Sequence, residues 1–482
     1  MTGVRSRTGA ALADPVAVRI ARSAQAREGV RTTLVEFHRW FASYAEQSYA
    51  QVEPVALEEL SGWGTDRHSG SLVHDSGRFF SVQGLEVHSP GAAVPHWRQP
   101  IINQPEIGIL GILASEFDGV LHFLMQAKVE PGNCNGLQLS PTVQATRSNY
   151  TRVHGGRAVP YLEYFQDTAR RTVIADVRQS EQGSWFYRKR NRNMIIEVSG
   201  RVEVLDGFCW LTLGQIHTLL GVDDLVNMDS RTVLSCLPLL GPTTDVGAGR
   251  QMWPAPLGPG EEDGDSVHTL EEILSWITDV RSSLEMRVHS VALDQVTDWH
   301  RTDGRICHET GLFFDVMGVR VLARGREVAQ WTQPMIQATL PGVVGFLMRT
   351  VGGVPHVLVQ AKAKPGYVDG LELAPTVQCT PQNYDVLPAA ARPPFLDEVL
   401  HADAARIRFD TMLSEEGGRF YHTRSRYLVV QADADGPSLA ARRPDFRWVS
   451  VHQLADLLRH SYYLNVEARS LIACLHSVAQ VL

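Results

Sequence analysis

Cysteine is scarce in this sequence, and the few cysteines that it has are not paired. None of them lies in a CxxC motif or beside histidines at the spacing of zinc ligands. This excludes a paired-cysteine zinc site, and we expect reduced thiols, as in a cytoplasmic protein. The six are Cys134, Cys209, Cys236, Cys307, Cys379 and Cys474.

Long hydrophobic runs and basic blocks are also missing. No apolar run approaches the roughly 20 residues that a membrane-spanning helix needs, and the first thirty residues lack the hydrophobic stretch of a secretory signal. The net charge is -8, with no Lys/Arg cluster that would bind a phosphate backbone. We therefore expect a soluble protein that binds neither membranes nor nucleic acid.

The motifs of several large enzyme classes are absent too. The sequence has no GxSxG, no HExxH, no P-loop and no glycine-rich dinucleotide fingerprint. SEEGGRF, from Ser414, has adjacent acids but lacks the preceding Arg-Glu turn of the helix that ligates divalent cations in Nudix hydrolases. We therefore expect neither a metal ion nor a cofactor.

What the sequence does contain is an internal duplication. QAKVEPGNCNGLQLSPTVQATRSNY, from Gln126, and QAKAKPGYVDGLELAPTVQCTPQNY, from Gln360, agree at 15 of 25 positions. HDSGRFFSVQGLEV, from His74, likewise matches HETGLFFDVMGVRV, from His308. This period is too long for a solenoid or a propeller, so it indicates tandem duplication of a whole domain.

The boundaries follow from composition and from the extent of the matches. We expect a flexible N-terminal extension over 1–30, a first repeat over 31–240, a Gly/Pro-rich linker over 241–267 and a second repeat over 268–482. Apolar periodicity predicts a helix at 34–47, strands in FFSVQGLEV, IINQPEIGILGIL and VLHFLMQAKV, and a helix in PYLEYFQDTARR. Thr212 and Ser450 are placed to cap two later helices. This order is typical of an α+β fold with a mixed sheet flanked by helices.

Two predicted strands carry polar side chains on one face. Period-2 geometry groups His122, Gln126 and Lys128, and the next strand groups Thr142, Gln144 and Thr146. Amides and hydroxyls on adjacent strands suit a sugar or a pyrimidine base, although a solvated sheet face is the alternative. WFYRKRNR, from Trp185, and RFYHTRSR, from Arg419, add aromatic rings beside cations, which could stack a ring and bind phosphate.

Longer motifs carry a resemblance to a known family. WRQPIINQPEIGIL, VLHFLMQAKVEPGN, QLSPTVQATRSNYTRVHGGR and PYLEYF, with WTQPMI, VQAKAKPG, PTVQCTPQNY and SEEGGRFYH in the second repeat, resemble the NDP-hexose 2,3-dehydratases of deoxysugar biosynthesis. The resemblance implies two tandem Nudix-like domains without the metal-binding box, a homodimer, and a dTDP-4-keto-6-deoxyglucose substrate. It also implies a product that a sugar 3-ketoreductase consumes on the way to the 2,6-dideoxysugars of antibiotics.

Such a dehydration needs a base, a donor to the oxyanion at carbon 4 and an acid for the leaving hydroxyl. Glu106 is the candidate base because its apolar strand context would raise its pKa, although an exposed strand-end carboxylate is the alternative. Lys128 or His122 could donate to the oxyanion, and Tyr150 or Tyr187 could protonate the leaving group. The predicted substrate-binding residues are Trp97, Gln126, Thr142, Gln144, Thr146, Arg147, Asn149, Arg152, His154 and Arg188.

The second repeat offers an equivalent pocket with fewer charged groups. Its predicted binding residues are Trp331, Gln360, Lys362, Gln378, Asn383, Tyr384, Tyr421 and Arg426. At the positions of Glu106, Arg147, Arg152 and His154 it has Leu340, Pro381, Val386 and Pro388. We therefore expect catalysis in the first repeat only, unless these changes are neutral surface drift. A sugar-nucleotide hydrolase and a non-catalytic sugar-nucleotide-binding protein are the alternative functions.

Overall fold

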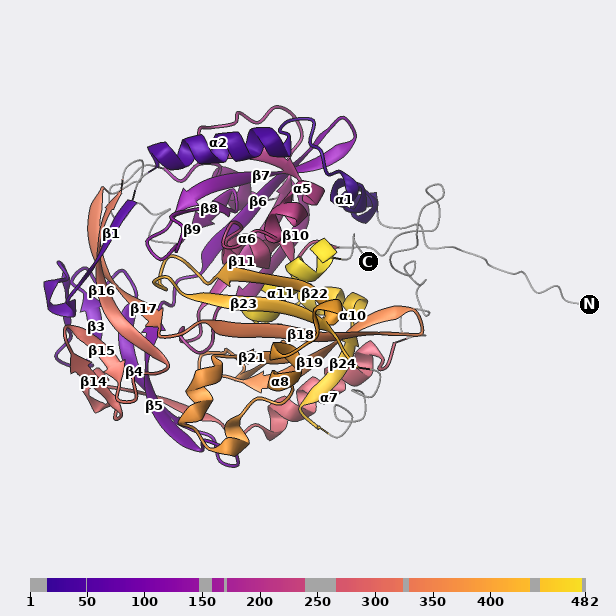
Figure 1. The fold of residues 1–482 in the computed structure, drawn as a ribbon. Helices are drawn as coiled ribbons and strands as arrows, with labels where there is room; N and C mark the ends of the chain where they lie inside the picture. The colour runs from indigo at the N-terminus through magenta and orange to yellow at the C-terminus, as the bar shows by residue number, and fades with distance from the viewer. Residues whose placement is uncertain are drawn as a thin grey trace, which may run out of the picture.

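The structure is a computed structural model that describes residues 15–48, 50–146, 158–168, 171–238, 266–323, 329–433 and 443–478. It is an α+β protein in which one set of elements occurs twice (Figure 1). Each repeat has a large mixed sheet, a smaller antiparallel sheet and flanking helices. Most of the expected linker lies outside the described residues. No described helix is both long and apolar enough to span a membrane.

The large sheet of the first repeat has the order β10-β11-β6-β7-β12, with β9 beside β6 and β8 beside β7. Strands β11 and β6 are parallel and the other pairs are antiparallel, so the sheet is mixed as expected. The bounds are β6 Gly108–Phe117, β7 Val120–Val129, β8 Leu137–Ser140, β9 Val143–Ala145, β10 Thr172–Ser180, β11 Arg190–Glu197 and β12 Phe208–Thr212.

The large sheet of the second repeat has the same topology. Its order is β20-β19-β18-β23-β22, with β21 beside β18 and β24 beside β19, and β18 and β23 are its parallel pair. The bounds are β18 Gly342–Val351, β19 Val354–Ala363, β20 Leu371–Ala374, β21 Val377–Cys379, β22 Ile407–Ser414, β23 Arg424–Gln431 and β24 Phe446–Ser450.

The two small sheets exchange a strand. β1 of the first repeat pairs antiparallel with β16 of the second (Figure 1). β13 of the second repeat pairs antiparallel with β4 of the first. Each repeat therefore completes the sheet of the other. The strands are β1 Ala50–Val55, β2 Trp63–Thr65, β3 Leu72–His74, β4 Ser81–His88, β5 His96–Asn103, β13 Arg287–Val291, β14 Trp299–Thr302, β15 Arg305–His308, β16 Phe314–Ala323 and β17 Gln330–Ala338.

The helices begin largely where the sequence predicts. Helix α2 spans Leu34–Gln47 as expected, and the Thr212 and Ser450 hydroxyls accept from the N3 backbone N–H groups of α5 and α10. The helices are α1 Pro15–Gln25, α2, α4 Glu163–Gln166, α5 Leu213–Leu220, α6 Met228–Leu234, α7 Leu270–Ser283, α8 Leu396–Leu400, α10 Val451–Leu458 and α11 Val466–Val478, with 3₁₀ turns at Leu57–Glu59, Leu293–Gln295, Pro381–Asp385, Ala389–Ala391 and Ala404–Arg406.

Four expectations need correction. The helix expected in PYLEYFQDTARR is the single turn α4, because β10 already begins at Thr172. The run IINQPEIGILGIL is two strands, β5 and β6, and Glu106 lies in the loop between them. The face of β7 expected to be polar is only partly so, because a second hydrophobic cluster that includes Phe165 buries Leu124 on it, while Gln126 and Lys128 stay half-buried. The expected extension over 1–30 contains helix α1, which buries Ile20 in the main core and is therefore packed rather than flexible.

The Pro-Gly pair in the two duplicated segments, QAKVEPG and QAKAKPG, has a structural role. The Gly132 N–H donates to Gly417 O, and the Gly132 carbonyl accepts from the His422 N–H; the second repeat makes the same pair of contacts through Gly366. A Cβ on Gly132 would lie 1.8 Å from the Phe420 carbonyl oxygen. Glycine is required at this position because the two backbones touch.

We expect Gly132→Ala to destabilise the fold by about 1–3 kcal/mol, because a methyl group cannot fit against a fixed backbone carbonyl. The measurement is the denaturant midpoint of unfolding. Gly64→Ala is the matched control, since a Cβ there meets nothing within 4 Å. Equal midpoints for the two variants would show that the backbone at the contact between the repeats can shift to accommodate a methyl group at little cost in stability.

Candidate active site

A cavity of about 260 Å³ opens at one end of the large sheet in the first repeat, and we call it the first cavity. The carboxyl-terminal ends of β7, β9 and β10 and the first turn of α6 bring polar side chains to the same place. The second repeat closes the wall with the segments 331–333 and 416–419. The charged side chains that line it are Lys128, Glu130, Glu181, Lys189, Asp229, Glu416 and Arg419.

Several of these groups hold one another in place. Lys128 Nζ lies 3.5 Å from Glu130 Oε1, which also accepts from Gln144 Nε2 at 2.9 Å. Glu181 accepts from Asn191 Nδ2 at 2.7 Å. The Glu416 carboxylate accepts from the backbone N–H groups of Gly418 and Arg419 at 2.9 and 2.8 Å. The cavity is therefore lined by positioned carboxyl and ammonium groups.

Burial moves the pKa values of these groups toward neutrality. It raises the pKa of Glu181, and it raises that of Asp229 well above its ordinary value, with the negative charges of Glu181, Glu416 and Glu130 adding to the effect. Burial, with repulsion from Glu130, raises the pKa of Glu416 to about 7. Burial also lowers the pKa of Lys189 to about 8. Groups that titrate near pH 7 are suited to proton transfer.

Aromatic rings line the opposite part of the first cavity. Trp63, Phe79, Phe80 and Phe186 come from the first repeat, and Trp331 comes from the second. The Arg419 guanidinium lies over the Phe80 ring, 4.3 Å from its centroid. Flat apolar surfaces beside acid–base groups can accommodate a ligand with one stacking ring and one reactive polar end.

The second repeat forms an equivalent cavity, which we call the second cavity. It is larger, about 640 Å³, and the first repeat contributes the segments 94, 96–99, 182 and 184–185 to its wall. Glu415 and Glu467 stand at the positions of Glu181 and Asp229.

The other charged positions of the first cavity are occupied by different residues in the second. Lys364 replaces Glu130, Gln182 replaces Glu416, Thr423 replaces Lys189, and Trp185 replaces Arg419. The second cavity thus keeps two carboxyl groups and a lysine, but it lacks a carboxylate at the position of Glu416, an ammonium group at that of Lys189 and a guanidinium at that of Arg419.

Three residues predicted for the first site line the first cavity, namely Lys128, Gln144 and Thr146. Glu106 is not among the lining residues; it lies in the β5–β6 loop, and its carbonyl oxygen accepts from Lys189 Nζ at 2.5 Å. His122 is fully buried at the far end of β7, where its Nδ1 lies 2.9 Å from Val120 O. The positions of Arg147, Asn149, Tyr150, Arg152 and His154 lie outside the described residues.

The remaining predicted residues of the first site lie elsewhere. Thr142 is buried, and its hydroxyl accepts from Leu113 N and donates to Leu124 O, so it joins two strands instead of facing a ligand. Gln126 does not line the cavity. Tyr187 packs against the small cluster of Leu85, Val87 and Ile101, and the exposed Arg188 lies over its ring.

The two tryptophans are exchanged relative to expectation. Trp97 lines the second cavity and Trp331 lines the first, because β5 and β17 extend across the boundary between the repeats. Of the other residues predicted for the second pocket, Gln378, Asn383 and Tyr384 line the second cavity. The other four, Lys362, Gln360, Arg426 and Tyr421, do not line the second cavity. Lys362 donates a hydrogen bond to Gln378 O, Gln360 donates one to Asp445, and Arg426 donates one to Asp410.

Sequence reasoning missed most of the charged lining. The matching segments SEQG and SEEG, at Ser180 and Ser414, contain Glu181, Glu415 and Glu416, and could have been read as a retained acidic position. Asp229 and Glu467 likewise match across the repeats. The contribution of Glu416 and Arg419 to the first cavity has no local signal, because it depends on how the repeats pack.

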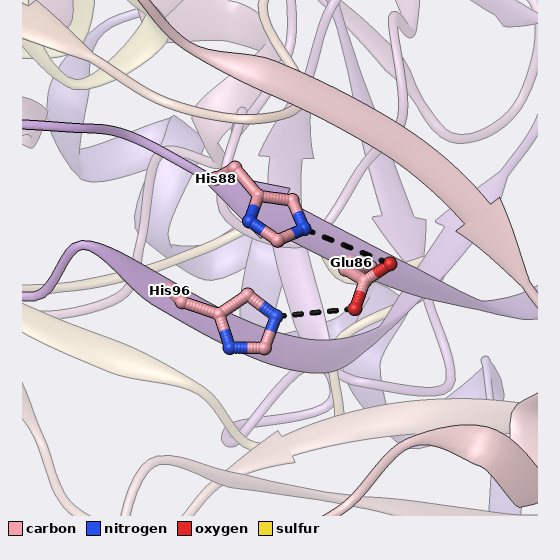
Figure 2. Close-up of side chains that lie close together, drawn as sticks. All are labelled: Glu86, His88 and His96. Atoms are coloured by element: carbon pink, nitrogen blue, oxygen red, sulfur yellow. Dashed lines mark hydrogen bonds and ion pairs between the residues drawn. The ribbon is translucent and has the colours of Figure 1, made fainter.

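Glu86, His88 and His96 lie close together on β4 and β5, with their ligand atoms within 4.8 Å of one another (Figure 2). Such a set could hold a metal ion. However, Arg98 donates to the Glu86 carboxylate at 2.9 and 2.6 Å and, with His96, lowers its pKa to about 2. Because a cation already occupies this carboxylate, we assign the cluster as a surface ion-pair network.

Comparison with known proteins identifies the family. The family model of the NDP-hexose 2,3-dehydratases matches residues 34–237 and 270–475. Three similar proteins carry the name dTDP-4-dehydro-6-deoxy-alpha-D-glucopyranose 2,3-dehydratase. The one from Saccharopolyspora spinosa is 48% identical over 92% of this chain and 91% of its own. That from Amycolatopsis orientalis is 48% identical over 99% and 97%, and that from Streptomyces violaceoruber is 46% identical over 93% and 98%. The two matched regions coincide with the two structural repeats, and the chain belongs to the NDP-hexose 2,3-dehydratase family.

Proposed function

We propose that this protein is a dTDP-4-keto-6-deoxy-D-glucose 2,3-dehydratase, a hydro-lyase that acts in the first cavity. The observation that supports this most strongly is the grouping of four carboxyl groups and two lysines beside aromatic rings. An elimination next to a ketone needs proton donors and acceptors and a surface for the nucleotide base. The names of the relatives support the same substrate.

The reaction follows from the chemistry of the substrate. The ketone at carbon 4 makes the hydrogen on carbon 3 acidic, and a carboxylate of the cavity removes it. The electron pair forms an enolate, which then expels the hydroxyl group from carbon 2 as a proton donor turns it into water. The remaining enol tautomerises to the 3,4-diketo-2,6-dideoxyhexose. No electrons leave the substrate, so the residues of the chain need only transfer protons and stabilise the enolate.

The cavity provides groups for each step. Lys128 can donate to the oxygen at carbon 4 as negative charge develops, as its position on β7 suggests. Burial raises the pKa of Asp229 well above its ordinary value, which favours the protonated form that can donate to the leaving hydroxyl. Tyr150 stays a predicted proton donor. His122 and Tyr187 have no part in this scheme because neither lines the first cavity.

The wider proposals rest on the resemblance to the family. They comprise a duplicated Nudix-like fold without its metal box, a homodimer, and consumption of the product by a sugar 3-ketoreductase in the biosynthesis of deoxysugars for antibiotics. A cytoplasmic location is proposed separately, from the unpaired cysteines of the sequence. The second cavity would retain nucleotide-sugar binding through Gln378, Asn383 and Tyr384, without catalysis.

Incubation of the purified protein with the 4-keto sugar nucleotide tests the function. We expect a diketo product, which can be trapped by a sugar 3-ketoreductase and identified by mass spectrometry as the loss of one water. Release of thymidine monophosphate would instead indicate a hydrolase. Tight binding without turnover would indicate a non-catalytic binding protein.

Turnover should not depend on a divalent metal ion, since protons alone are transferred and the Nudix metal motif is absent from the sequence. We expect the rate after exhaustive dialysis against EDTA to match that of untreated protein. Mg²⁺ or Zn²⁺ added back should not raise it. A rate that is abolished by EDTA and restored by a metal would contradict the proposed mechanism.

Paired lysine substitutions test which repeat catalyses. Lys128→Ala should lower kcat/KM about 100- to 1,000-fold, as the loss of one oxyanion donor does elsewhere. Lys362→Ala should have a much smaller effect, because Lys362 donates to Gln378 O and does not line the second cavity. Thermal unfolding of both variants controls for folding. The reverse order of effects would place catalysis in the second repeat.

A further inference from the structure

The first cavity is incomplete without the second repeat. The loop between β22 and β23 extends across the boundary and places Glu416, Gly418 and Arg419 in the wall of the first cavity. The contacts of Gly132 with Gly417 and His422 fix this loop beside the end of β7. A group that the second repeat contributes can therefore take part in the reaction of the first.

Three of the four carboxyl groups in the first cavity are poorly suited to remove a proton from carbon. Glu130 is engaged by the Lys128 ammonium group and the Gln144 amide. Burial and the neighbouring carboxylates raise the pKa of Asp229 well above its ordinary value, which favours the protonated form. Glu181 is buried at the end of β10, where one oxygen accepts a hydrogen bond from Asn191, whereas Glu416 is half-buried.

Glu416 is held differently. Its two oxygens accept from two successive loop amides, those of Gly418 and Arg419, which fix the position of the carboxylate. Burial and the charge of Glu130 oppose the charged form, whereas the Arg419 guanidinium and the backbone N–H groups stabilise it, and the resulting pKa is about 7. A carboxylate with this pKa is basic enough to accept a proton and is partly ionised at neutral pH.

The second cavity provides an internal comparison. The position equivalent to Glu416 is Gln182 in the first repeat, which lines the second cavity and donates from Nε2 to Glu415 Oε2 at 3.3 Å. An amide of the same size preserves the shape of the loop but cannot accept a proton. The two cavities thus differ at this position in basicity while keeping the same architecture.

From this geometry we infer that Glu416, contributed by the second repeat, is the base that removes the hydrogen from carbon 3 of the substrate in the first cavity. The inference rests on the proposed dehydratase function. In the step, a Glu416 oxygen forms a bond to the proton as the C3–H bond breaks, and the electron pair moves into the C3–C4 enolate. The carboxylic acid that results later returns the proton to solvent.

The test uses the full-length chain and a substrate with deuterium at carbon 3. Glu416→Gln should lower kcat about 100- to 10,000-fold and abolish the release of deuterium into water, because the amide cannot accept the proton. Glu416→Asp should retain part of the rate. Binding of thymidine diphosphate and the unfolding midpoint should stay at wild-type values. Glu59→Gln makes the same chemical change at an exposed ion pair outside both cavities and should leave turnover unchanged.

The pH profile adds a second readout. In the wild type, kcat/KM should rise with pH up to about 7 and then level off, since the base acts only when deprotonated. The residual kcat/KM of the Glu416→Gln variant should not show this rise between low pH and pH 7. A folded Glu416→Gln variant that retains the rate, or that still releases deuterium without forming product, would overturn the inference and leave the dehydratase function intact. A wild-type protein that forms no diketo product would instead overturn the proposed function itself.

Discussion

The exchange of one edge strand between the repeats is the constraint on which the rest of this structure depends. β1 and β13 each leave their own repeat and pair along their whole length with β16 and β4 of the other. A sheet edge left open would present unpaired N–H and C=O groups, so neither small sheet is complete in one repeat alone. The two repeats are thereby held side by side, and both cavities have walls from both halves of the chain, contributed by β5, β17 and the β10–β11 and β22–β23 loops.

Two buried arginines reinforce the same arrangement deep in the core. Arg231 on α6 donates to Ser414 O of the second repeat, and Arg469 on α11 donates to Ser180 O of the first. Each serine directly precedes a cavity glutamate. Burial raises the pKa of Glu181 and the positive charge of Arg469 opposes that rise, so the second repeat also tunes a proton equilibrium in the first cavity. Structural support and electrostatic tuning come from the same side chains.

Local elements could be predicted from the sequence because their causes are local. Helix α2 has its capping threonine and its apolar stripe within fourteen residues, and β7 spans the predicted segment because its period-2 pattern is uninterrupted. The sequence does not show that Trp97 and Trp331 each line the cavity of the other repeat. They stand at the beginnings of β5 and β17, and no sequence pattern records which repeat the beginning of a strand will face. Glu416 and Arg419 were missed as parts of the first cavity for the same reason.

The shared wall also explains how two similar repeats can hold chemically different cavities. Glu181 and Gln182 are adjacent yet line the first and second cavities respectively, and Glu415 and Glu416 line the second and the first. A substitution at one such residue changes one cavity and leaves the adjacent side chain, in the other cavity, in place. The replacements Gln182 for Glu416 and Thr423 for Lys189 remove charge while preserving the loop and strand contacts. The second cavity can therefore lack the counterparts of Glu416 and Lys189 while its repeat remains necessary for the wall, the edge strand and the arginine contacts of the first.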